Sequence, residues 1–377
     1  MSKSESSPQT IVLIGPTYPF RGGIAHYTTL LGMALAEQHE LHLVSFKRQY
    51  PQWLYPGESD QDPSREPLQL QAEYLLDPLY PWTWWQAVSR IRQIDPQVVI
   101  IAWWTTFWGP AFASLAWGLR RHGIPVIFLI HNVYPHEARP WDRWIARTVL
   151  SQGQACLVQS ENEQRRLVEL LPGMRIGLSQ LPLCDFLTER RHPKAEARQA
   201  LGLPAAAPVL LFFGIVRAYK GLGYLLQALA RLAEQGQRPH LVIAGEFWEP
   251  RQAYERQIAG LGLQEQITIL DRYIPDEQVA QLFSAADGFV APYTGGTQSG
   301  AIKIAASFGL PIILSESLAD NLAPGAGRFV IRPQDQDAFV RALQDLLALR
   351  SDQVILAQGD TTWQDLVQVI EKLAASL

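Results

Sequence analysis

The stretch VLLFFGIVRAYKGLGYLLQALARLAEQ, residues 209–235, decides the fold class. Its first five residues are all apolar, which predicts a strand that is covered on both faces. From Leu222 to Gln235 the apolar residues recur at helical spacing, and a further apolar run follows at Leu241–Ala244. A strand, a helix and a second strand in this order indicate two parallel strands joined by a crossover helix.

The same alternation runs through the chain. Apolar runs that predict strands lie at Ile11–Ile14, Leu41–Phe46, Val98–Ala102, Val126–Ile130 and Ala155–Val158, and later at Val209–Phe213, Leu241–Ala244, Ile267–Leu270, Gly288–Ala291 and Ile312–Leu314. Helical patterns such as Ala25–Glu37 separate most of them. Two such series predict an α/β protein with two doubly wound, Rossmann-like domains.

A segment without a strand pattern, Leu187–Pro208, separates the two series. It is charged and then rich in alanine and proline, as expected of a hinge. We therefore expect an N-terminal domain over residues 1–186 and a C-terminal domain over residues 187–360. Residues 361–377 predict one amphipathic helix, for which packing back on the first domain is one arrangement.

The composition excludes several classes of protein. Hydrophobic residues make up 47% of the 377 residues, so the chain can bury sizeable cores and is not disordered. A net charge of −4 offers no basic excess, so nucleic acid is not expected as a partner. Two cysteines, Cys156 and Cys184, exclude a disulfide framework and a four-cysteine zinc site, and they favour a reducing compartment, the cytoplasm.

One uncharged stretch, residues 98–119, is long enough to span a bilayer. Gly109-Pro110 interrupts it, and Arg120-Arg121 follows it. These signals favour a strand, a loop and a helix opened by Pro110 over a membrane span. At the other end of the domain, residues 1–10 are polar, and the apolar run after them is too short for a signal peptide.

Two cations follow the first strand of the second domain. Arg217 and Lys220 lie three residues apart, between Gly214 and Gly221 and just before a helix. A planar guanidinium and an ammonium in such a loop could clamp a diphosphate. The alternative is a pair of solvated surface cations, which is the usual fate of these residue types.

A second loop in this domain, GGTQSG at residues 295–300, precedes the expected helix Ala301–Phe308. A glycine-flanked helix start with hydroxyl side chains suits a phosphate, and Ser299 is the expected N-cap. The alternative is an ordinary capped helix after a flexible loop.

The first domain offers two candidates at strand ends. Gly22 and Gly23 lie between the first strand and a helix, where the backbone can approach an anion. His131 is the first polar residue after the strand Val126–Ile130, at the edge of an open sheet where ligands bind. It could donate to a sugar hydroxyl. A plain turn and a histidine bonded to loop carbonyls are the alternatives.

No metal site is expected. The sequence Asp-x-Asp occurs at Asp60/Asp62 and Asp335/Asp337, but neither pair directly follows an apolar strand. Asp335 and Asp337 begin a helix pattern, where acidic residues favour the helix dipole.

Tryptophans crowd the first domain. There are 12 in the chain, and Trp84-Trp85 precede Arg90 and Arg92 in an amphipathic helix pattern. Core packing explains Trp103 and Trp104, which lie on or beside a strand. For the helix, the alternative to packing is peripheral contact with a membrane surface, on its inner face, or with a lipid or glycan acceptor.

The two loops of the second domain, together with Val242–Glu249 and Ile269–Pro275, resemble the donor domain of family 4 glycosyltransferases of the GT-B fold. The first domain matches more loosely, through Gly22-Gly23, His131 and Gln159-Ser160-Glu161. The resemblance covers nearly the whole chain. It implies two Rossmann-like domains that face a cleft.

The resemblance also implies transfer of a sugar from a nucleoside diphosphate sugar to a glycan or lipid-linked acceptor, with retention, without a metal or other cofactor, in glycan or polysaccharide assembly. By position, Arg217 and Lys220 are similar to the cations on the diphosphate, and His131 to the histidine near the transferred sugar. The donor-binding residues that it implies are Gly22, Gly23, Arg217, Lys220, Glu246, Tyr273, Ile274, Thr297, Gln298, Ser299 and Gly300.

This sequence departs from the family pattern at one point. Many members carry two glutamates eight residues apart in the last motif, and here those places fall on Gly296 and Ile304. Gln298 and Glu246 are the available substitutes. The departure leaves open a second reading, a nucleotide-sugar-binding scaffold without catalysis. A nicotinamide oxidoreductase is disfavoured because the dinucleotide-binding glycines are absent.

Overall fold

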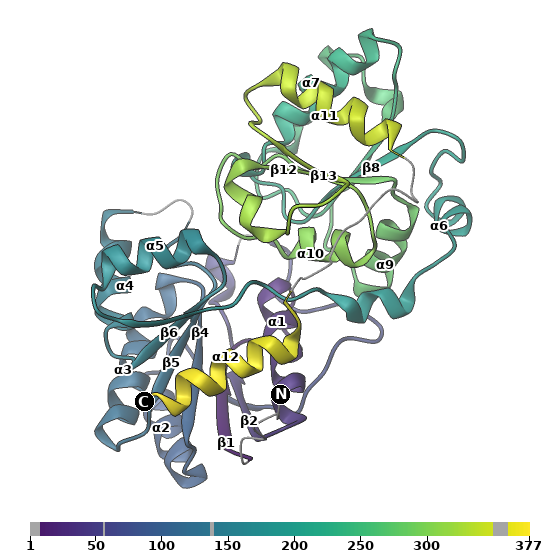
Figure 1. Ribbon diagram of the computed structural model, residues 1–377. Coiled ribbons are helices and arrows are strands. Elements are labelled where there is room, and N and C mark those ends of the chain that lie inside the picture. The colour runs from purple at the N-terminus through teal and green to yellow at the C-terminus, as the bar shows by residue number, and fades with distance from the viewer. Residues whose placement is uncertain (1–7, 56, 136–138, 350–360) are drawn as a thin grey trace, which may run out of the picture. The chain divides into compact units, whose positions relative to one another are not determined.

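The computed structural model describes residues 8–55, 57–135, 139–349 and 361–377. Its contacts divide the chain into two compact units, each built on a parallel sheet (Figure 1). The first unit comprises Met1–Pro63, Pro67–Gln180 and Thr361–Leu377, and the second Ser64–Glu66 and Leu181–Asp360. The division after Gln180 falls slightly before the boundary expected at residue 186.

The first unit contains a seven-stranded parallel sheet, counted over the described residues, in the order β3-β2-β1-β4-β5-β6-β7. Its strands are β1 (Thr10–Ile14), β2 (Glu40–Phe46), β3 (Glu73–Leu76), β4 (Val98–Trp103), β5 (Val126–Ile130), β6 (Ala155–Val158) and β7 (Arg175–Leu178). Every residue of β4 and β5 is buried, because helices cover both faces of the sheet. In register, Leu13 pairs with Ile100, which pairs with Ile127.

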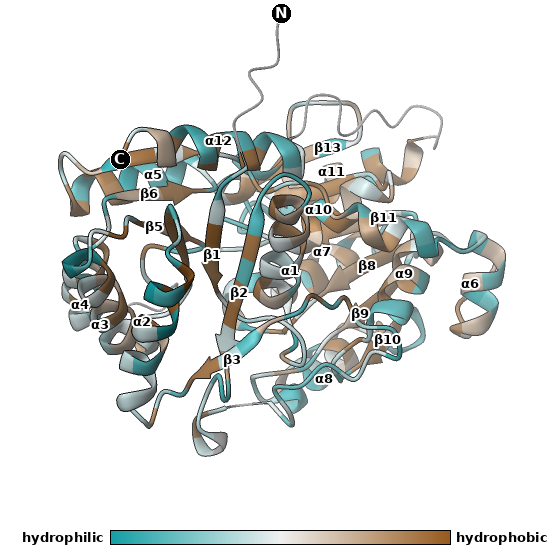
Figure 2. Ribbon diagram, turned by 90° about the horizontal axis from the view of Figure 1, so that it is seen from below, coloured by the Kyte–Doolittle hydropathy of each residue, from teal (hydrophilic) through white to brown (hydrophobic). Residues whose placement is uncertain are grey.

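The helices of the first unit form two layers. They are α1 (Gly23–Ala36), α2 (Trp82–Ile94), α3 (Gly109–Arg121), α4 (Pro140–Leu150), α5 (Glu161–Leu170) and α12 (Trp363–Ala375), with short 3-10 helices η1 (Gln52–Leu54) and η2 (Thr106–Trp108). Helix α3 packs between α2 and α4 on one face, and α1 and α12 lie on the other (Figure 2). As expected, α3 has proline in its first turn and ends in two arginines.

The last helix, α12, packs on α1 and β7 of the first unit. Gly177 makes room for it in β7, since a Cβ there would lie 2.6 Å from the Leu373 side chain. Glu371 lies 3.2 Å from His39 Nε2, and the Trp363 ring lies 5.2 Å from that of Tyr27.

The second unit contains a six-stranded parallel sheet in its described residues, in the order β10-β9-β8-β11-β12-β13. Its strands are β8 (Val209–Phe213), β9 (His240–Ala244), β10 (Ile267–Leu270), β11 (Gly288–Ala291), β12 (Ile312–Ser315) and β13 (Arg328–Ile331). Its helices are α6 (Lys194–Ala200), α7 (Leu222–Glu234), α8 (Arg251–Gly260), α9 (Asp276–Ala285), α10 (Gly300–Ser307) and α11 (Gln336–Ala348), with 3-10 helices η3 (Asp185–Arg190), η4 (Ala218–Lys220), η5 (Gln264–Gln266) and η6 (Glu316–Asn321).

Three strands have no counterpart in the sequence prediction: β3, β7 and β13. All three lie at sheet edges, where one side faces no neighbouring strand. Their sequences EYLL, RIGL and RFVI carry a charge and are only partly buried, so they lack the apolar run that marks a central strand.

The uncharged stretch 98–119 forms β4, η2 and the greater part of α3, as the sequence predicts. Among the described residues, no helix has the length and hydropathy needed to cross a bilayer.

Candidate functional site

Two loops of the second unit touch through their glycine backbones. Gly214 follows β8 and Gly245 follows β9, both with positive φ (101° and 142°). A Cβ on Gly245 would lie 2.3 Å from the Gly214 carbonyl oxygen, so any side chain there would clash with backbone. The Gly214 N–H donates to Ala244 (2.9 Å), and the Val216 N–H donates to the Glu246 carbonyl (2.8 Å). The loop with the two cations is thereby fixed beside Glu246.

Arg217 lies at the start of η4. Its guanidinium carbon lies 5.8 Å from the Trp248 ring centroid, and the Trp248 indole N–H donates to the Glu246 carboxylate (3.2 Å). Stacking against an aromatic ring limits the directions in which a guanidinium can point. Trp248 therefore holds both a cation and an acid of the predicted site in place.

Lys220 ends η4 and lies close to the backbone of the same loop. A Cβ on Gly214 would lie 2.7 Å from its Nζ, which is 5.3 Å from the Tyr293 ring centroid. Loss of water contact lowers the Lys220 pKa; the charge of Arg217 lowers it further, while Tyr219 acts in the opposite direction. Among the described residues, no carboxylate pairs with this ammonium. An anion bound here would supply the missing partner.

Asn321 holds the loop before α10. Its side-chain oxygen accepts from the Ser299 N–H (2.9 Å), and its side-chain nitrogen donates to the carbonyls of Thr297 (2.8 Å) and Leu318 (3.1 Å). All these groups are buried. Asn321 therefore sets the shape of the loop that the sequence predicts as a phosphate cradle.

Ser299 occupies the N-cap position of α10 as expected, but its side chain makes no capping hydrogen bond. Instead, its hydroxyl lies 3.4 Å from that of Tyr293, whose pKa is raised to about 12 by burial. Ser299 therefore holds the predicted N-cap position without a side-chain cap, and the Ile302 N–H of the first turn donates to the Ser299 carbonyl (3.1 Å). Gly300 begins the helix and is exposed, while the buried Gln298 Nε2 has no hydrogen-bond partner among the described residues.

The remaining donor-site predictions lie between β10 and α9. Tyr273 is partly buried, and Ile274 belongs to the hydrophobic core with 4% of its surface exposed. Only the backbone of Ile274 is therefore available to a ligand.

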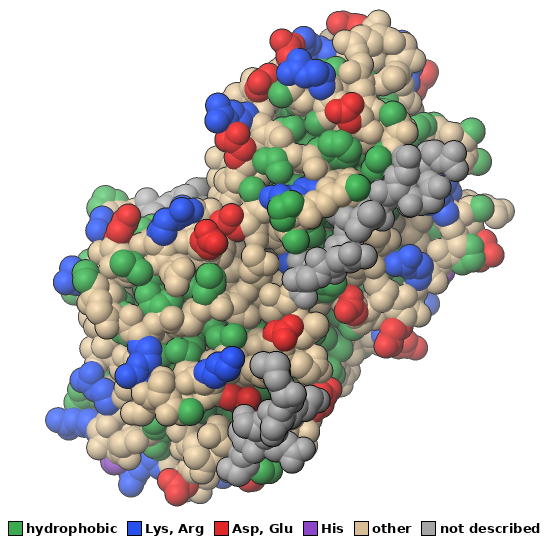
Figure 3. Space-filling view, in the orientation of Figure 1, with side chains coloured by type: hydrophobic (Ala, Val, Ile, Leu, Met, Phe, Trp, Pro, Cys, Tyr) green, Lys and Arg blue, Asp and Glu red, His purple; other side chains and the backbone are tan. Residues whose placement is uncertain are grey.

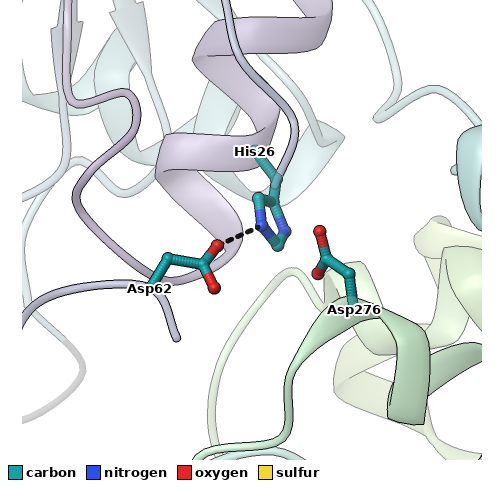
Figure 4. Close-up of side chains that lie close together, drawn as sticks. All are labelled: His26, Asp62 and Asp276. Carbon is teal, nitrogen blue, oxygen red and sulfur yellow. Dashed lines mark ion pairs between the residues drawn. The ribbon is translucent and has the colours of Figure 1, made fainter. Parts of the chain in front are cut away.

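In the first unit, Gly22 caps α1 with a φ of 105°, and Gly23 is its first residue. A Cβ on either would meet no atom within 4 Å, and the first turn carries no acidic residue. His26, one turn on, lies 3.5 Å from the Asp62 carboxylate (Figure 4). Asp62 thus has a partner within its own unit.

His131 lies at the end of β5 in a buried polar cluster. Its backbone N–H donates to Trp103 (2.9 Å), and its ring meets Tyr27 edge-on at 4.9 Å. Burial lowers the His131 pKa to about 4, and the nearby Gln159 amide partly offsets this. The imidazole is therefore neutral at pH 7. Within the described residues, His131 Nε2, the Gln159 amide and the Tyr27 hydroxyl have no partner in hydrogen-bonding geometry.

The structure thus brings the predicted residues together in two groups, one in each unit. The second unit holds its group in the segments after β8, β9, β10 and β11, and the first unit holds Gly22, Gly23 and His131 after β1 and β5. Their functional roles stay predictions. Sequence reasoning missed Asn321 and Tyr27, because both act through contacts distant in sequence that no local motif marks.

Two family models match the chain. One, "Glycosyl transferases group 1", matches residues 207–349, and the other, "Glycosyl transferase 4-like domain", matches residues 22–182. The chain belongs to the family 4 glycosyltransferases. The first of these models falls within the second unit and the other lies almost entirely in the first, and together they include the predicted site residues.

Among curated proteins, the chain is similar to distant glycosyltransferases. The chain is similar to alpha-D-kanosaminyltransferase of Streptomyces kanamyceticus, at 27% identity over 45% of this chain and 47% of that protein. It is also similar to GDP-mannose:glycolipid 4-beta-D-mannosyltransferase of Xanthomonas campestris pv. campestris, at 28% identity over 56% and 58%. The matches therefore span about half the length of these curated relatives.

Solved structures support the GT-B fold of this chain. Sucrose-phosphate synthase from Thermosynechococcus elongatus aligns with a TM-score of 0.68 and 20% identity, over 98% of this chain and 94% of that one. Anabaena Alr3699/HepE in complex with UDP and glucose aligns with a TM-score of 0.71 and 14% identity, over 98% and 99%.

Proposed function

We propose that this glycosyltransferase moves a sugar from a nucleoside diphosphate sugar to a glycan or lipid-linked acceptor. The observation that carries the proposal is the Lys220 ammonium, which is partly buried, has no paired carboxylate among the described residues, and lies in the same loop as Arg217. A site of this kind favours an anion with several oxygens. The similar Anabaena protein was solved with UDP and with UDP-glucose, which supports a nucleotide sugar as donor.

The chemistry follows from where charge develops. When the bond between the sugar and the diphosphate breaks, negative charge grows on the departing diphosphate. Fixed cations at Arg217 and Lys220, together with the exposed backbone of Gly300 at the start of α10, would stabilise that charge more in the transition state than in the ground state. Because both cations are held by neighbouring backbone and rings, little reorganisation is needed.

His131 is proposed to act on the sugar. Its low pKa keeps it neutral, so it can exchange a hydrogen bond with a hydroxyl without bringing a charge. Its unpartnered Nε2 and the adjacent Gln159 amide are suited to that contact. Retention at the anomeric carbon is part of the proposal and rests on the family.

Metal independence is likewise proposed. This proposal rests on the family resemblance and on the partners of the acidic pairs, since Asp62 lies 3.5 Å from His26. Of the Asp-x-Asp pairs, Asp335 caps α11 and Asp337 pairs with Arg231. The expected compartment is the cytoplasm.

The glutamates missing from the last motif favour a second candidate function, a scaffold that binds nucleotide sugars without turning them over. Gly296 has a φ of 93° and Ile304 packs against the core, so neither offers an acid. The Glu246 carboxylate, beside Arg217 through Trp248, is the substitute nearest the cations.

A panel of nucleotide sugars distinguishes the sugar transferase from the non-catalytic scaffold. The protein is incubated with each donor, with and without excess chelator, and nucleoside diphosphate release and thermal shift are measured. We expect release for at least one donor, unchanged by chelator. A thermal shift without release, including with added lipid and glycan acceptors, would favour the scaffold. Neither signal for any donor would refute the donor site, and loss of release with chelator that manganese restores would refute metal independence.

A further inference from the structure

Three aromatic side chains from distant segments of the first unit form a row that ends at His131. Trp363 begins α12, Tyr27 lies on α1, and His131 follows β5. The ring centroids of Tyr27 and His131 are 4.9 Å apart with their planes at 88°, and those of Tyr27 and Trp363 are 5.2 Å apart at 58°. Aromatic pairs favour edge-to-face and tilted contacts at such distances. Helix α12 therefore reaches His131 through one intervening ring.

The middle ring, Tyr27, is held by packing and not by hydrogen bonds. It exposes only 5% of its surface, and its hydroxyl has no partner in hydrogen-bonding geometry within the part of the chain that the structure describes. A buried ring without hydrogen bonds takes its orientation from the groups packed against it. The contact with Trp363 therefore helps to set how Tyr27 meets His131.

The loop that carries His131 is fixed through its backbone. The His131 N–H donates to the Trp103 carbonyl (2.9 Å), and the Val133 N–H donates to the buried Glu163 carboxylate (2.6 Å). The Val133 carbonyl accepts from the Trp103 indole N–H (3.1 Å). These bonds place the backbone but leave the imidazole able to rotate. The edge-on contact with Tyr27 then limits that rotation.

The start of α12 holds Trp363 in place. The Thr362 hydroxyl accepts from the Asp365 N–H (3.1 Å), and the Asp365 carboxylate accepts from the Thr362 N–H (2.9 Å), which makes a capping box. Leu366 and Val367, in the next turn, are fully buried. Figure 3 shows acidic and basic side chains on the outward side of the first unit where α12 lies in Figure 1, so the apolar side of this helix faces inward. Trp363 therefore stands on a capped and anchored helix.

We propose that Trp363 and Tyr27 are positioning residues that hold the His131 imidazole in the orientation needed to meet the transferred sugar. The inference rests on the proposed role of His131. A ring that exchanges one hydrogen bond with a hydroxyl must present its nitrogen to within about 10–20° of the productive direction. Backbone bonds in the loop cannot supply this precision, whereas a packed ring can. Helix α12 thus has a part in the chemistry of the first unit as well as in its packing.

The first test needs no substrate. In the free full chain with isotope-labelled histidine, the magnetic resonance signals of the His131 ring are assigned by their loss in His131→Gln. We expect Trp363→Leu to shift or broaden them, because Tyr27 gains freedom, and Trp363→Phe to leave them close to those of the parent. The matched control Leu373→Ala removes the contact of α12 with Gly177 and should lower stability without moving these signals. Unchanged signals in Trp363→Leu, or an equal change in Leu373→Ala, would overturn the proposal.

The second test is turnover of the nucleotide sugar that releases most diphosphate in the panel above. An aromatic pair is worth roughly two- to twelvefold, so Trp363→Leu should lower kcat roughly three- to tenfold, with the donor KM within about twofold of the parent value. Trp363→Phe should recover most of the rate. If Trp363→Leu keeps the parent kcat while His131→Ala loses it, the positioning role is refuted.

A double-variant cycle shows whether Tyr27 acts through His131. Tyr27→Leu should lower kcat at least about tenfold in the parent, since small misplacements of a reacting group are costly, but should cause no further loss in His131→Ala. Equal losses in both backgrounds would mean that Tyr27 only supports the fold. If His131→Ala itself keeps the parent kcat, the proposed function of His131 fails, and the ring signals alone decide whether Trp363 orients it. The Trp363 variants carry both tests if Tyr27→Leu does not fold.

Discussion

Replacing Lys220 with methionine should weaken diphosphate binding strongly without destabilising the fold. The methionine keeps most of the volume of the side chain and removes only the charge. In the structure this charge is held against Gly214 and over Tyr293, with no carboxylate partner among the described residues. The ammonium is thus disfavoured in the free protein and favoured once an anion binds.

The charge of Lys220 is expected to favour diphosphate binding and to disfavour folding. A charge-assisted hydrogen bond contributes roughly 1.5–3 kcal/mol, so Lys220→Met should weaken binding of a nucleoside diphosphate by on the order of tenfold to a hundredfold. The Lys220 pKa is lower in the folded chain than in the unfolded one, so the charged form costs stability at neutral pH. That cost falls once the pH exceeds the pKa of Lys220 in the folded chain, and it is gone above the pKa of Lys220 in the unfolded chain. The variant should therefore unfold at an equal or higher denaturant concentration at pH 7.

Calorimetry with uridine diphosphate measures the first effect, and denaturant unfolding at pH 7 measures the second. Lys372→Met, which removes an exposed lysine of α12, is the matched control and should leave both unchanged. If Lys220→Met folds normally and binds the diphosphate as tightly as the parent, Lys220 is not a phosphate ligand. If it binds weakly but is also clearly destabilised, the lost affinity reflects damage to the loop, and the reasoning from an unpaired charge fails.

Three further outcomes are expected. His131→Ala should lower kcat at least about tenfold, or ~1.4 kcal/mol, with little effect on diphosphate binding measured by calorimetry; unchanged kcat would remove His131 from the site. The His131 pKa is about 4 in the folded chain and 6.5 in the unfolded chain, so the unfolded chain takes up a proton first as the pH falls. The free energy of unfolding should therefore fall by on the order of 2 kcal/mol between pH 7 and pH 5. In His131→Gln it should change less over this pH range. Asn321→Ala should raise the KM for the donor several-fold and lower stability by about 1–3 kcal/mol, since the Ser299 N–H and the carbonyls of Thr297 and Leu318 all lose a hydrogen-bond partner; an unaffected KM would show that the loop does not depend on Asn321.

The sequence predicts the central strands well because their signal is local. Runs such as VVIIA at residues 98–102 must be buried on both faces, and nothing but a covered parallel sheet accommodates several of them. The sequence does not predict the edge strands β3, β7 and β13, because they are only partly buried and lack a continuous apolar run. The placement of α12 on β7 depends on Gly177 and Leu373, which are far apart in the chain, so no pattern in either segment predicts it.

The same division applies to the candidate site. Glycine, arginine and lysine after a strand are visible in the sequence, and the structure holds them at the expected sheet edge. Ser299 stands at the predicted N-cap position, but its hydroxyl lies beside that of Tyr293 and not on a first-turn N–H. Tertiary packing decides where such a side chain points, and the local sequence does not show it.

The frame of the proposed donor site is held by backbone contacts rather than by the side chains that would touch the ligand. The Gly214 and Val216 N–H groups donate to the β9 loop, and the Thr294 N–H donates to the Tyr219 carbonyl (2.7 Å). The loops after β8, β9 and β11 are therefore joined whatever stands at the positions facing the ligand. Loss of both motif glutamates, at Gly296 and Ile304, removes two side chains but none of these bonds. We infer that the departure changes which base and sugar are bound more than whether a diphosphate is bound, since the diphosphate contacts depend on Arg217, Lys220 and the frame itself.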